Sequence, residues 1–473
     1  DTGLLDKTHI HFFTYYEIVK MFHKEGYELE LVCSREIPIS QDDKNLIEKL
    51  VANKIITELE AENINKNKVL NFTKSTIWKE LKEAKEIAAP HGQPFNEKGW
   101  EYILKEHGGA LPLRIEAVAE GSVVPTENVL VQMQNTDANV PWLVGWVETA
   151  LLRAIWYPVA VATNSYFCKE LISRFLSETG SPSEIDFKLH DFGARGVSSF
   201  ESAGIGGSAH LLNFKGSDTI SGALFARQFY GADMAAFSIP ASEHSTMTAW
   251  GKERENLAYA NMSERFGDSV FACVIDSYNI ENAILEWSKL MPSIKERGGR
   301  VVLRPDSGNP VAMAILCIER LIELVGARKN EKGYLVLPDF VRVIYGDGIG
   351  LERIGDILGE LKMRGISSDN IAFGMGGALL QHLSRDTLRF AMKASAVSKD
   401  GINWQNIAKE PISDPSKHSK PGRLALVRNG KHWKTIRLDE LASEQNQLVP
   451  VFENGKILRE YNFEEIRARI ANG

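Results

Sequence analysis

From about Phe187 onward the chain repeats one unit, a short apolar run, a polar turn that contains glycine, and an amphipathic helical pattern. Short apolar runs bounded by turns are typical of buried strands, and here they alternate with helical patterns such as Val311–Val325 and Leu351–Leu361. The eight runs are Phe187–Leu189, Leu211–Phe214, Ala235–Ile239, Phe271–Ile275, Val301–Leu303, Val341–Tyr345, Ile371–Phe373 and Phe390–Met392. Eight strand-then-helix units predict a (β/α)8-type barrel in the α/β class.

The segments on either side of this repeat differ from it in composition and in the spacing of their apolar residues. Residues 40–107 are rich in Lys, Glu and Asn with apolar positions at helical spacing, and residues 110–134 alternate as short β-strands do. After about residue 395 the repeat gives way to a basic stretch rich in Pro and Ser. We therefore expect an N-terminal α+β domain over residues 1–150, a barrel-type catalytic domain over 151–394 and a C-terminal segment over 395–473.

Charge and cysteine content narrow the class of protein. The formal net charge is −7, so no global positive field favours nucleic acid as a partner. The four cysteines are far apart and match neither a disulfide framework nor a CxxC metal pair, which favours a cytoplasmic location. The most apolar stretch, residues 150–162, is too short to span a bilayer, so no membrane association is expected.

The polar residues that follow the predicted strands should converge, because active sites of such barrels lie on the loops after the strands. Arg195 and Arg304 are suited to grip phosphate, although each could instead pair with a carboxylate, and Asp306 stands beside Arg304. Glycine turns at Gly346-Asp347-Gly348 and at Gly374, Gly376 and Gly377 could bring backbone N–H groups to an anion. Asp347 would suit ribose hydroxyls.

His244 is the candidate nucleophile or base, with Asp276 predicted on the same face to orient its imidazole. Phe192 could stack on a flat ring, although an aromatic residue after a strand is ordinarily part of the core. Asp276, Asp306 and Asp347 could hold Mg²⁺ directly or through water and phosphates, whereas no His/Cys metal signature is present. These residues describe a pocket for a phosphorylated sugar, a pyrophosphate and a planar partner.

Several motifs, in this order along the chain, resemble the nicotinamide phosphoribosyltransferase family of type II phosphoribosyltransferases, and the resemblance runs from about Phe95 to the C-terminus. They are Lys188-Leu-His-Asp-Phe-Gly, Arg195-Gly-Val-Ser-Ser, Glu243-His-Ser-Thr, Asp276-Ser-Tyr, Arg304-Pro-Asp-Ser-Gly-Asn-Pro, Gly346-Asp-Gly and Ile371-Ala-Phe-Gly-Met-Gly-Gly. The resemblance implies the barrel of that family, with an appended α+β domain to which both terminal segments contribute.

The resemblance also implies an activity. Nicotinamide would attack the anomeric carbon of 5-phosphoribosyl-1-pyrophosphate to give nicotinamide mononucleotide and pyrophosphate in NAD salvage. Mg²⁺, held mainly by the substrate phosphates, is the implied cofactor, ATP the implied co-substrate and a homodimer the implied assembly. By the same resemblance the catalytic residues are His244, Asp276 and Asp306, and the substrate-binding residues are Phe192, Arg195, Asp218, Ser238, Arg304, Gly346, Asp347, Gly376, Gly377 and Arg385.

Individual roles follow from the matched positions. Phe192 is expected to stack on nicotinamide, and Asp218 to face its carboxamide, because a carboxylate accepts from an amide N–H and repels the carboxylate of nicotinate. His244 matches the phosphorylated histidine through which ATP hydrolysis is coupled to synthesis. Four further residues, Arg35, Lys393, Lys409 and Lys417, resemble contacts to phosphate or ATP. The family's N-terminal Thr-Asp-Ser-Tyr-Lys-like segment does not align with the opening Asp1-Thr-Gly-Leu-Leu, so the second face of the nicotinamide site stays unassigned.

Two other functions remain open at this level. A nicotinate phosphoribosyltransferase would share the barrel and the chemistry, and a cationic residue in place of Asp218 would favour it. A non-catalytic protein that binds a nucleotide for sensing or signalling would use the same barrel. The presence together of His244, Asp276, Arg304, Asp306 and Asp347 favours the enzyme.

Overall fold

The computed structural model describes residues 84–413, 418–442 and 445–472, so the predicted phosphate contacts Arg35 and Lys417 lie outside the described residues. The chain divides into two compact units, residues 1–112 and residues 113–473. In the first unit, the described residues form a helix over 84–91 and helix α6 (Glu97–Glu106). The Asn96 side chain caps α6 by accepting a hydrogen bond from the Gly99 N–H at 3.2 Å.

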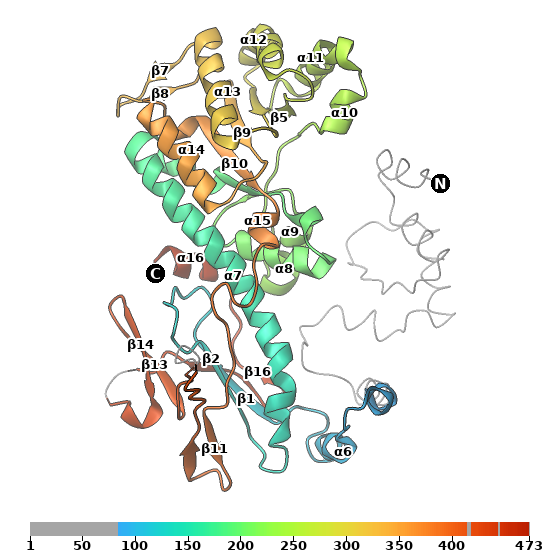
Figure 1. The fold of residues 1–473 in the computed structure, drawn as a ribbon, viewed down its shortest axis with the longest axis vertical. Helices are drawn as coiled ribbons and strands as arrows, with labels where there is room; N and C mark the ends of the chain where they lie inside the picture. Colours follow the sequence, from blue (N-terminus) through green and yellow to red (C-terminus); the bar gives the residue numbers. More distant parts are fainter. Residues whose placement is uncertain (1–83, 414–417, 443–444, 473) are drawn as a thin grey trace. The chain divides into compact units, whose positions relative to one another are not determined.

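The second unit is built around a curled parallel sheet of six strands, in the order β4-β3-β10-β9-β6-β5 (Figure 1). The strands are β3 (Leu189–Asp191), β4 (Gly216–Ser217), β5 (Val270–Val274), β6 (Arg300–Arg304), β9 (Val341–Tyr345) and β10 (Ile371–Met375). The segment over residues 237–242 joins both edges of this sheet, because Phe237 bridges to Gly216 of β4 and Ala241 bridges to Ala272 of β5. The sheet therefore curls as in an α/β barrel.

Alternation along each strand separates an inner from an outer face. One residue from each of β5, β6 and β9, namely Ala272, Val302 and Ile344, clusters with Phe192 and other partly buried side chains. Their neighbours, such as Phe271, Leu303 and Tyr345, belong to the large outer core that packs under the helices. Both faces are buried, which explains why the strands are continuous apolar runs in the sequence.

One long helix precedes the parallel strands, and further helices lie between and after them (Figure 1). They are α7 (Trp142–Thr179), α8 (Phe200–His210), α9 (Ile220–Tyr230), α10 (His244–Thr248), α11 (Glu255–Phe266), α12 (Ile280–Glu296), α13 (Pro310–Val325), α14 (Leu351–Met363) and α15 (Gly377–Leu380). Asn279 and Asn309 cap α12 and α13 through their side-chain oxygens, and Pro310 occupies the first turn of α13. The N-terminus of each helix is thereby fixed just after the preceding strand and loop.

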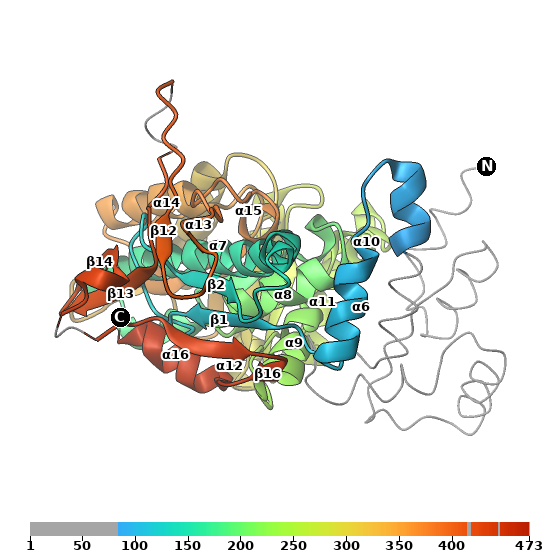
Figure 2. The same ribbon diagram turned by 90° about the horizontal axis from the view of Figure 1, so that it is seen from below.

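A smaller antiparallel sheet combines strands from both ends of the second unit, in the order β16-β15-β1-β2. The strands are β1 (Leu113–Ala117), β2 (Val131–Asn135), β15 (Val449–Glu453) and β16 (Lys456–Ile457). Helix α7 contacts β2 near one end and the barrel helices along the rest of its length (Figures 1 and 2). The C-terminal helix α16 (Phe463–Ala471) is held to the barrel by Arg467, which donates to the Leu211 and Ala235 carbonyl oxygens.

Three two-stranded ribbons complete the second unit. They are β7 (Arg328–Lys329) with β8 (Leu335–Val336), β11 (Ala396–Ser398) with β12 (Trp404–Asn406), and β13 (Leu424–Asn429) with β14 (His432–Arg437). The first lies close to the amino ends of the parallel strands, because Leu335 bridges to Ile366.

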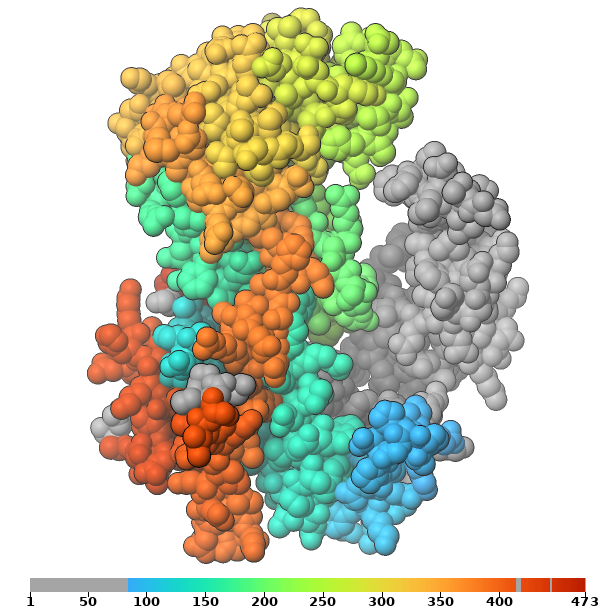
Figure 3. Space-filling model, viewed as in Figure 1, coloured from blue at the N-terminus to red at the C-terminus, as the bar shows by residue number. Residues whose placement is uncertain are grey.

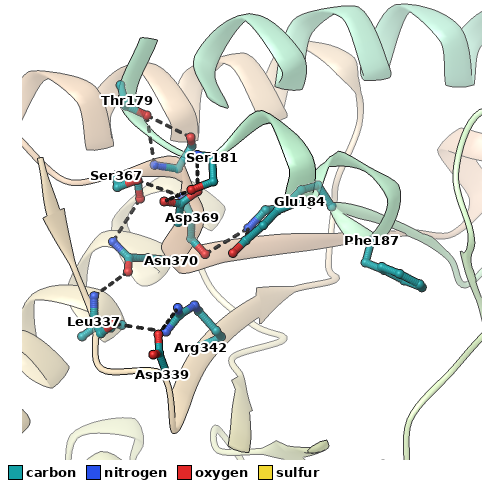
Figure 4. Close-up of polar contacts among 12 residues, drawn as sticks. Thr179, Ser181, Glu184, Phe187, Leu337, Asp339, Arg342, Ser367, Asp369 and Asn370 are labelled. Carbon is teal, nitrogen blue, oxygen red and sulfur yellow. Dashed lines mark hydrogen bonds and ion pairs between the residues drawn. The ribbon is translucent and has the colours of Figure 1, made fainter. Parts of the chain in front are cut away.

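At the amino ends of β3, β9 and β10, buried polar groups are densely paired (Figure 4). The Ser181 N–H donates to Asp369 Oδ1 at 2.7 Å, and Asn370 Oδ1 accepts from the Leu337 N–H at 2.8 Å. The Lys188 ammonium donates to the Asp369 carbonyl oxygen at 2.9 Å and pairs with Glu184. This end of the sheet, which we term the amino-end network, therefore leaves these buried groups satisfied.

The barrel-type fold and the contribution of both terminal segments to one α+β sheet agree with the sequence prediction. Three of the eight predicted strands were wrong. Residues 235–239 form no strand and contain only the isolated bridge of Phe237 to Gly216. Residues 211–214 form a hydrogen-bonded turn at the end of α8, where the Leu211 N–H bonds to the Gly207 carbonyl, and residues 390–392 are irregular. Helix α7 runs through the predicted domain boundary at residue 150. Among the helices in the described ranges, none is long and apolar enough to cross a membrane.

Candidate active site

The candidate site lies at the carboxyl ends of the parallel strands, where the polar loops predicted from the sequence come together. Phe192 follows β3, and its N–H bonds to the carbonyl of Met375 at the end of β10. Its ring lies over Gly374, because a Cβ atom built at Gly374 would come within 1.9 Å of the ring. Gly374 is therefore needed to make room for Phe192. Whether its N–H approaches an anion stays a prediction.

Arg304, the last residue of β6, forms the next wall of the site. Its guanidinium carbon lies 5.0 Å from the centre of the Phe192 ring, and its Nη2 donates to Asp306 Oδ2 at 2.9 Å. The carboxylate pairing considered from the sequence is thus present. The Arg304 Nε is nevertheless buried without a hydrogen-bond partner in the described part of the chain. Burial raises the pKa of Asp306, and the adjacent guanidinium opposes that rise.

His244 and Asp276 meet as the sequence predicts. The His244 Nε2 lies 2.9 Å from Asp276 Oδ1, and since a carboxylate only accepts, Nε2 is the donor. Burial alone would raise the pKa of Asp276, but hydrogen bonds from Ser307, His244 and the Asp306 N–H lower it. Asp276 therefore stays ionised and orients the imidazole, which leaves Nδ1 as the nitrogen available for chemistry.

Asp218 and Ser238 lie together at the neighbouring strand ends. Asp218 follows β4 and is exposed, and the Ser238 hydroxyl donates to its Oδ1 at 2.5 Å. The Asp218 N–H donates to the Asp191 carbonyl oxygen at 2.9 Å, which links this carboxylate to β3. An exposed, ionisable acceptor thus stands on a rigid strand end next to the loop that carries Phe192.

The remaining glycine turns lie at the same end. A Cβ atom built at Gly346 would lie 3.0 Å from Asp306 Oδ1 and 3.3 Å from the Phe192 ring, and Asp347 beside it is exposed. The short helix η2 (Ala194–Gly196) carries Arg195, which makes no ion pair among the described residues. At the Cβ position of Gly196 the nearest atom is the Gly377 Cα, 3.6 Å away. Arg195, Gly376 and Gly377 are therefore neighbours.

Three predicted contacts are not joined to this cluster by any hydrogen bond or ion pair. Arg385, Lys393 and Lys409 are exposed on the segment that runs from α15 across the surface of the second unit (Figure 3). Arg385 pairs instead with the adjacent Asp386 at 2.9 Å. Their roles toward phosphate or ATP stay predictions.

Two residues outside the predicted site set support it from below. Ser307 bonds to Asp276, and Asp191, fully buried at the end of β3, accepts the Gly193 N–H at 2.7 Å. Both residues lie within the motifs quoted from the sequence. Their supporting contacts could not be predicted, because the sequence around them does not show which site residues they bond.

The carboxylates of this site suit a metal that is held mostly by substrate. Asp276 uses both oxygens in hydrogen bonds, to His244 and to the Asp306 N–H. Asp306 uses Oδ2 for Arg304, which leaves Oδ1 toward Gly346. In the described ranges, no group of three or more His, Cys, Asp or Glu side chains is placed to hold a metal ion. A single free carboxylate oxygen fits Mg²⁺ only if phosphate oxygens and water complete its shell.

Two family models match this chain. Residues 187–456 match the model of the nicotinate phosphoribosyltransferase (NAPRTase) family, and residues 61–115 match the nicotinamide phosphoribosyltransferase N-terminal domain. The crystal structure of human nicotinic acid phosphoribosyltransferase is similar with a TM-score of 0.44 and 16% identity, covering 82% of this chain and 81% of that chain.

Three relatives are named nicotinamide phosphoribosyltransferase. The protein from Xanthomonas campestris pv. campestris is 49% identical over 82% of this chain and 85% of its own length. The Mycoplasma pneumoniae protein is 37% identical over 68% of this chain and 73% of its own length. The Acinetobacter baylyi protein is 32% identical over 78% of each chain. On these matches, this chain belongs to the nicotinamide phosphoribosyltransferase family.

Proposed function

We propose that the protein transfers the 5-phosphoribosyl group from 5-phosphoribosyl-1-pyrophosphate to nicotinamide, giving nicotinamide mononucleotide and pyrophosphate. It is thus a pentosyltransferase of NAD salvage. Asp218 is the observation that carries the choice of nicotinamide, since it places an exposed carboxylate at the end of β4, held by Ser238. A carboxylate accepts a hydrogen bond from a carboxamide N–H, but it repels the carboxylate of nicotinate.

The ring of nicotinamide is expected to stack on Phe192, whose position is fixed by Gly374 and Arg304. The bond from the anomeric carbon to pyrophosphate breaks as the pyridine nitrogen approaches, so positive charge develops on the ribose. Charged groups that are already fixed around the ribose and the pyrophosphate therefore stabilise the transition state most. Arg195 and Arg304 would bind phosphate, and Asp306, Gly346 and Asp347 would contact the ribose. Mg²⁺ on the phosphates would neutralise the leaving group.

ATP would act through His244. Because Asp276 holds Nε2, the free Nδ1 can attack the γ-phosphorus of ATP, forming a phosphohistidine and releasing ADP. A phosphoryl group there adds negative charge within reach of Mg²⁺ and the pyrophosphate site. Lys393, Lys409, Lys417 and Arg35 remain the proposed contacts to ATP or phosphate.

A homodimer is proposed from an apolar surface beside the site. Phe200 on α8 and Ile220 and Phe229 on α9 are 57%, 83% and 47% exposed, and Phe225 joins the phenylalanines through edge contacts. Ile220 lies two residues after Asp218, so a second copy seated here would adjoin the substrate site. Replacing Ile220 with Lys should shift the protein from dimer to monomer in light scattering, and an unchanged mass would contradict this assembly.

A cytoplasmic location is also proposed, and it is supported by three buried free cysteines, Cys168, Cys273 and Cys317.

The test of function is product formation with Mg²⁺ and 5-phosphoribosyl-1-pyrophosphate, with either nicotinamide or nicotinic acid, each with and without ATP. Faster turnover of nicotinamide, stimulated by ATP, is expected. His244→Ala should abolish the stimulation by ATP and keep basal turnover, whereas Asp218→Asn should narrow the preference for nicotinamide. Preference for nicotinic acid would identify the sister activity, and no turnover with either base would favour a nucleotide-binding protein.

A further inference from the structure

Asp191 is a buried carboxylate that the proposed mechanism does not use. It ends β3, where it pairs with Met375 of β10 and Ser217 of β4 in the sheet register. Side chains alternate along a strand, so Phe192 turns into the site while Asp191 turns outward under the helices. Asp191 therefore cannot touch a substrate that stacks on Phe192, and any role that it has must act through other residues.

The contacts of Asp191 reach three parts of the site. Its Oδ1 accepts the Gly193 N–H at 2.7 Å, which fixes the turn between Phe192 and Arg195. Its carbonyl oxygen accepts the Asp218 N–H at 2.9 Å. A Cβ atom at Gly193 would lie 2.6 Å from Leu380 and 3.0 Å from Asp191 Oδ1, so the turn is packed closely on this carboxylate.

The second carboxylate oxygen, Oδ2, is buried and has no hydrogen-bond partner in the described ranges. Thr219 lies close enough to lower the pKa of Asp191, but its geometry falls short of a hydrogen bond. Burial, opposed by the Gly193 N–H, raises the pKa of Asp191 to about 6. A group of this kind changes its charge near neutral pH.

Titratable and charged groups face Asp191 from several packed elements. From α7, Tyr157 faces Asp191, and burial raises the pKa of its hydroxyl to about 12. From α8, the Gly207 backbone approaches Oδ2, and burial lowers the pKa of His210 to about 3. Asp218, after β4, adds negative charge that raises the pKa of Asp191 further, and burial lowers the pKa of His190 on the same strand.

We propose that Asp191 is a positioning residue for nicotinamide, whose ionised carboxylate holds the Gly193 turn and whose protonation loosens it. A charged acceptor makes a hydrogen bond about twice as strong as a neutral one, so the neutral acid holds the Gly193 N–H less firmly. Phe192 and Asp218 then lose their fixed separation. The inference rests on the proposed function, because it assumes that nicotinamide binds between these two residues.

The sign of the effect follows from the ionisation. At pH 8 the carboxylate is ionised and nicotinamide binds well, and below pH 6 the neutral form prevails and the KM for nicotinamide rises. Asp191→Asn copies the neutral form at every pH. Its KM should be about five- to tenfold higher than that of the wild type at pH 8, with kcat changed less than about twofold.

The test compares wild type and Asp191→Asn from pH 5 to pH 8 at saturating 5-phosphoribosyl-1-pyrophosphate. Titrations that affect both proteins alike, such as those of the substrates, cancel in the ratio of their kcat/KM values. The ratio should be about five to ten at pH 8 and approach one near pH 5, with a midpoint near pH 6. A ratio that does not change with pH, or a loss confined to kcat, would overturn the proposal.

The wild-type profile tests the same idea without removing the carboxylate. The wild-type KM for nicotinamide should rise as the pH falls through about 6, where the pKa of Asp191 lies. A KM that does not change between pH 8 and pH 5 would contradict the proposal even if Asp191→Asn failed to fold. Wild type without turnover of nicotinamide at any pH would instead contradict the proposed function.

Discussion

The two ends of the parallel sheet handle buried polar groups differently. At the amino end, Asp369 and Asn370 have their side-chain groups paired with neighbouring backbone and side chains. At the carboxyl end, Arg304 Nε and Asp191 Oδ2 are buried without partners among the described residues. Unpaired buried groups cost free energy, so the carboxyl end is less stable than it could be. Of the two groups, only Arg304 Nε lies in the candidate site and can meet a ligand.

Strand β6 offers a direct test, since it begins with Arg300 at the amino end and finishes with Arg304 at the carboxyl end. Arg304→Ala should reduce kcat/KM by about 10² to 10³, or about 3–4 kcal/mol, because a positioned cation is lost. Arg304→Ala should affect the free energy of unfolding little. Burial already raises the pKa of Asp306, so its carboxyl can take up a proton rather than stay charged without its partner. Steady-state kinetics and thermal unfolding measure both quantities.

Arg300→Ala is the matched control. It removes a hydrogen bond to the Asp339 carbonyl oxygen and should leave kcat/KM within about twofold. Equal loss of activity in both variants would mean that the two ends of the strand do not differ in function.

Asn370→Ala should cost about 3 kcal/mol of unfolding free energy with unchanged kcat/KM at 25 °C. The substitution leaves the Leu337 N–H and the Leu335 and Ser367 carbonyl oxygens without the side chain that they bond in the interior. Urea denaturation followed by circular dichroism measures the loss. The exposed Asn472→Ala, which removes one bond at the end of α16, should cost less than about 0.5 kcal/mol.

Asp191→Asn should stabilise the protein by about 2 kcal/mol at pH 7.5, although it weakens nicotinamide binding. The pKa of Asp191 is raised in the folded state, so folding takes up a proton between about pH 4 and pH 6, and stability falls as pH rises through that range. The gain of the variant should vanish at pH 4, where wild-type Asp191 is neutral. Denaturation curves of wild type and Asp191→Asn at pH 7.5 and pH 4 measure this difference. A variant less stable than the wild type at pH 7.5 would contradict the prediction.

Lys332→Met tests the smallest contribution at the amino end. The Lys332 ammonium donates to the carbonyl oxygens of Leu176, Ser177 and Gly180 at the C-terminus of α7. Losing this cap should cost about 1 kcal/mol in chemical denaturation. Lys289→Met, which removes an exposed pair with Glu286, should cost about 0 to 0.5 kcal/mol. Equal values for both lysines would show that the helix end does not depend on its cap.

Sequence reasoning located the parallel strands well where an apolar run was followed by a glycine turn. The prediction for Val341–Tyr345 matches β9, and that for Phe271–Ile275 differs from β5 by one residue. It failed at residues 211–214, where Leu211 is buried against Phe463 of α16. A buried helical turn has as apolar a sequence as a buried strand. Over only four residues, the spacing of apolar positions cannot distinguish a turn from a strand.

The candidate site shows the same division. The meeting of His244 with Asp276 and of Arg304 with Asp306 was predictable, because strand ends share one edge of the sheet. The packing of the Phe192 ring against Gly374 was not predictable, because it depends on which face of the sheet each side chain points to. Neither was the burial of Asp191, because the sequence does not state which helix covers a given strand.

The pairing of β1 with β15 has a consequence for synthesis. Arg114 lies opposite Glu453, so strand β1 leaves the ribosome more than three hundred residues before its partner exists. Until then β1 presents an unpaired edge that other chains could join. The barrel residues lie between β1 and β15 in the sequence, so the barrel can assemble before β15 is made. Completion of the small antiparallel sheet is then a late, non-local step of folding. Cells that make this protein quickly would need to shield that edge.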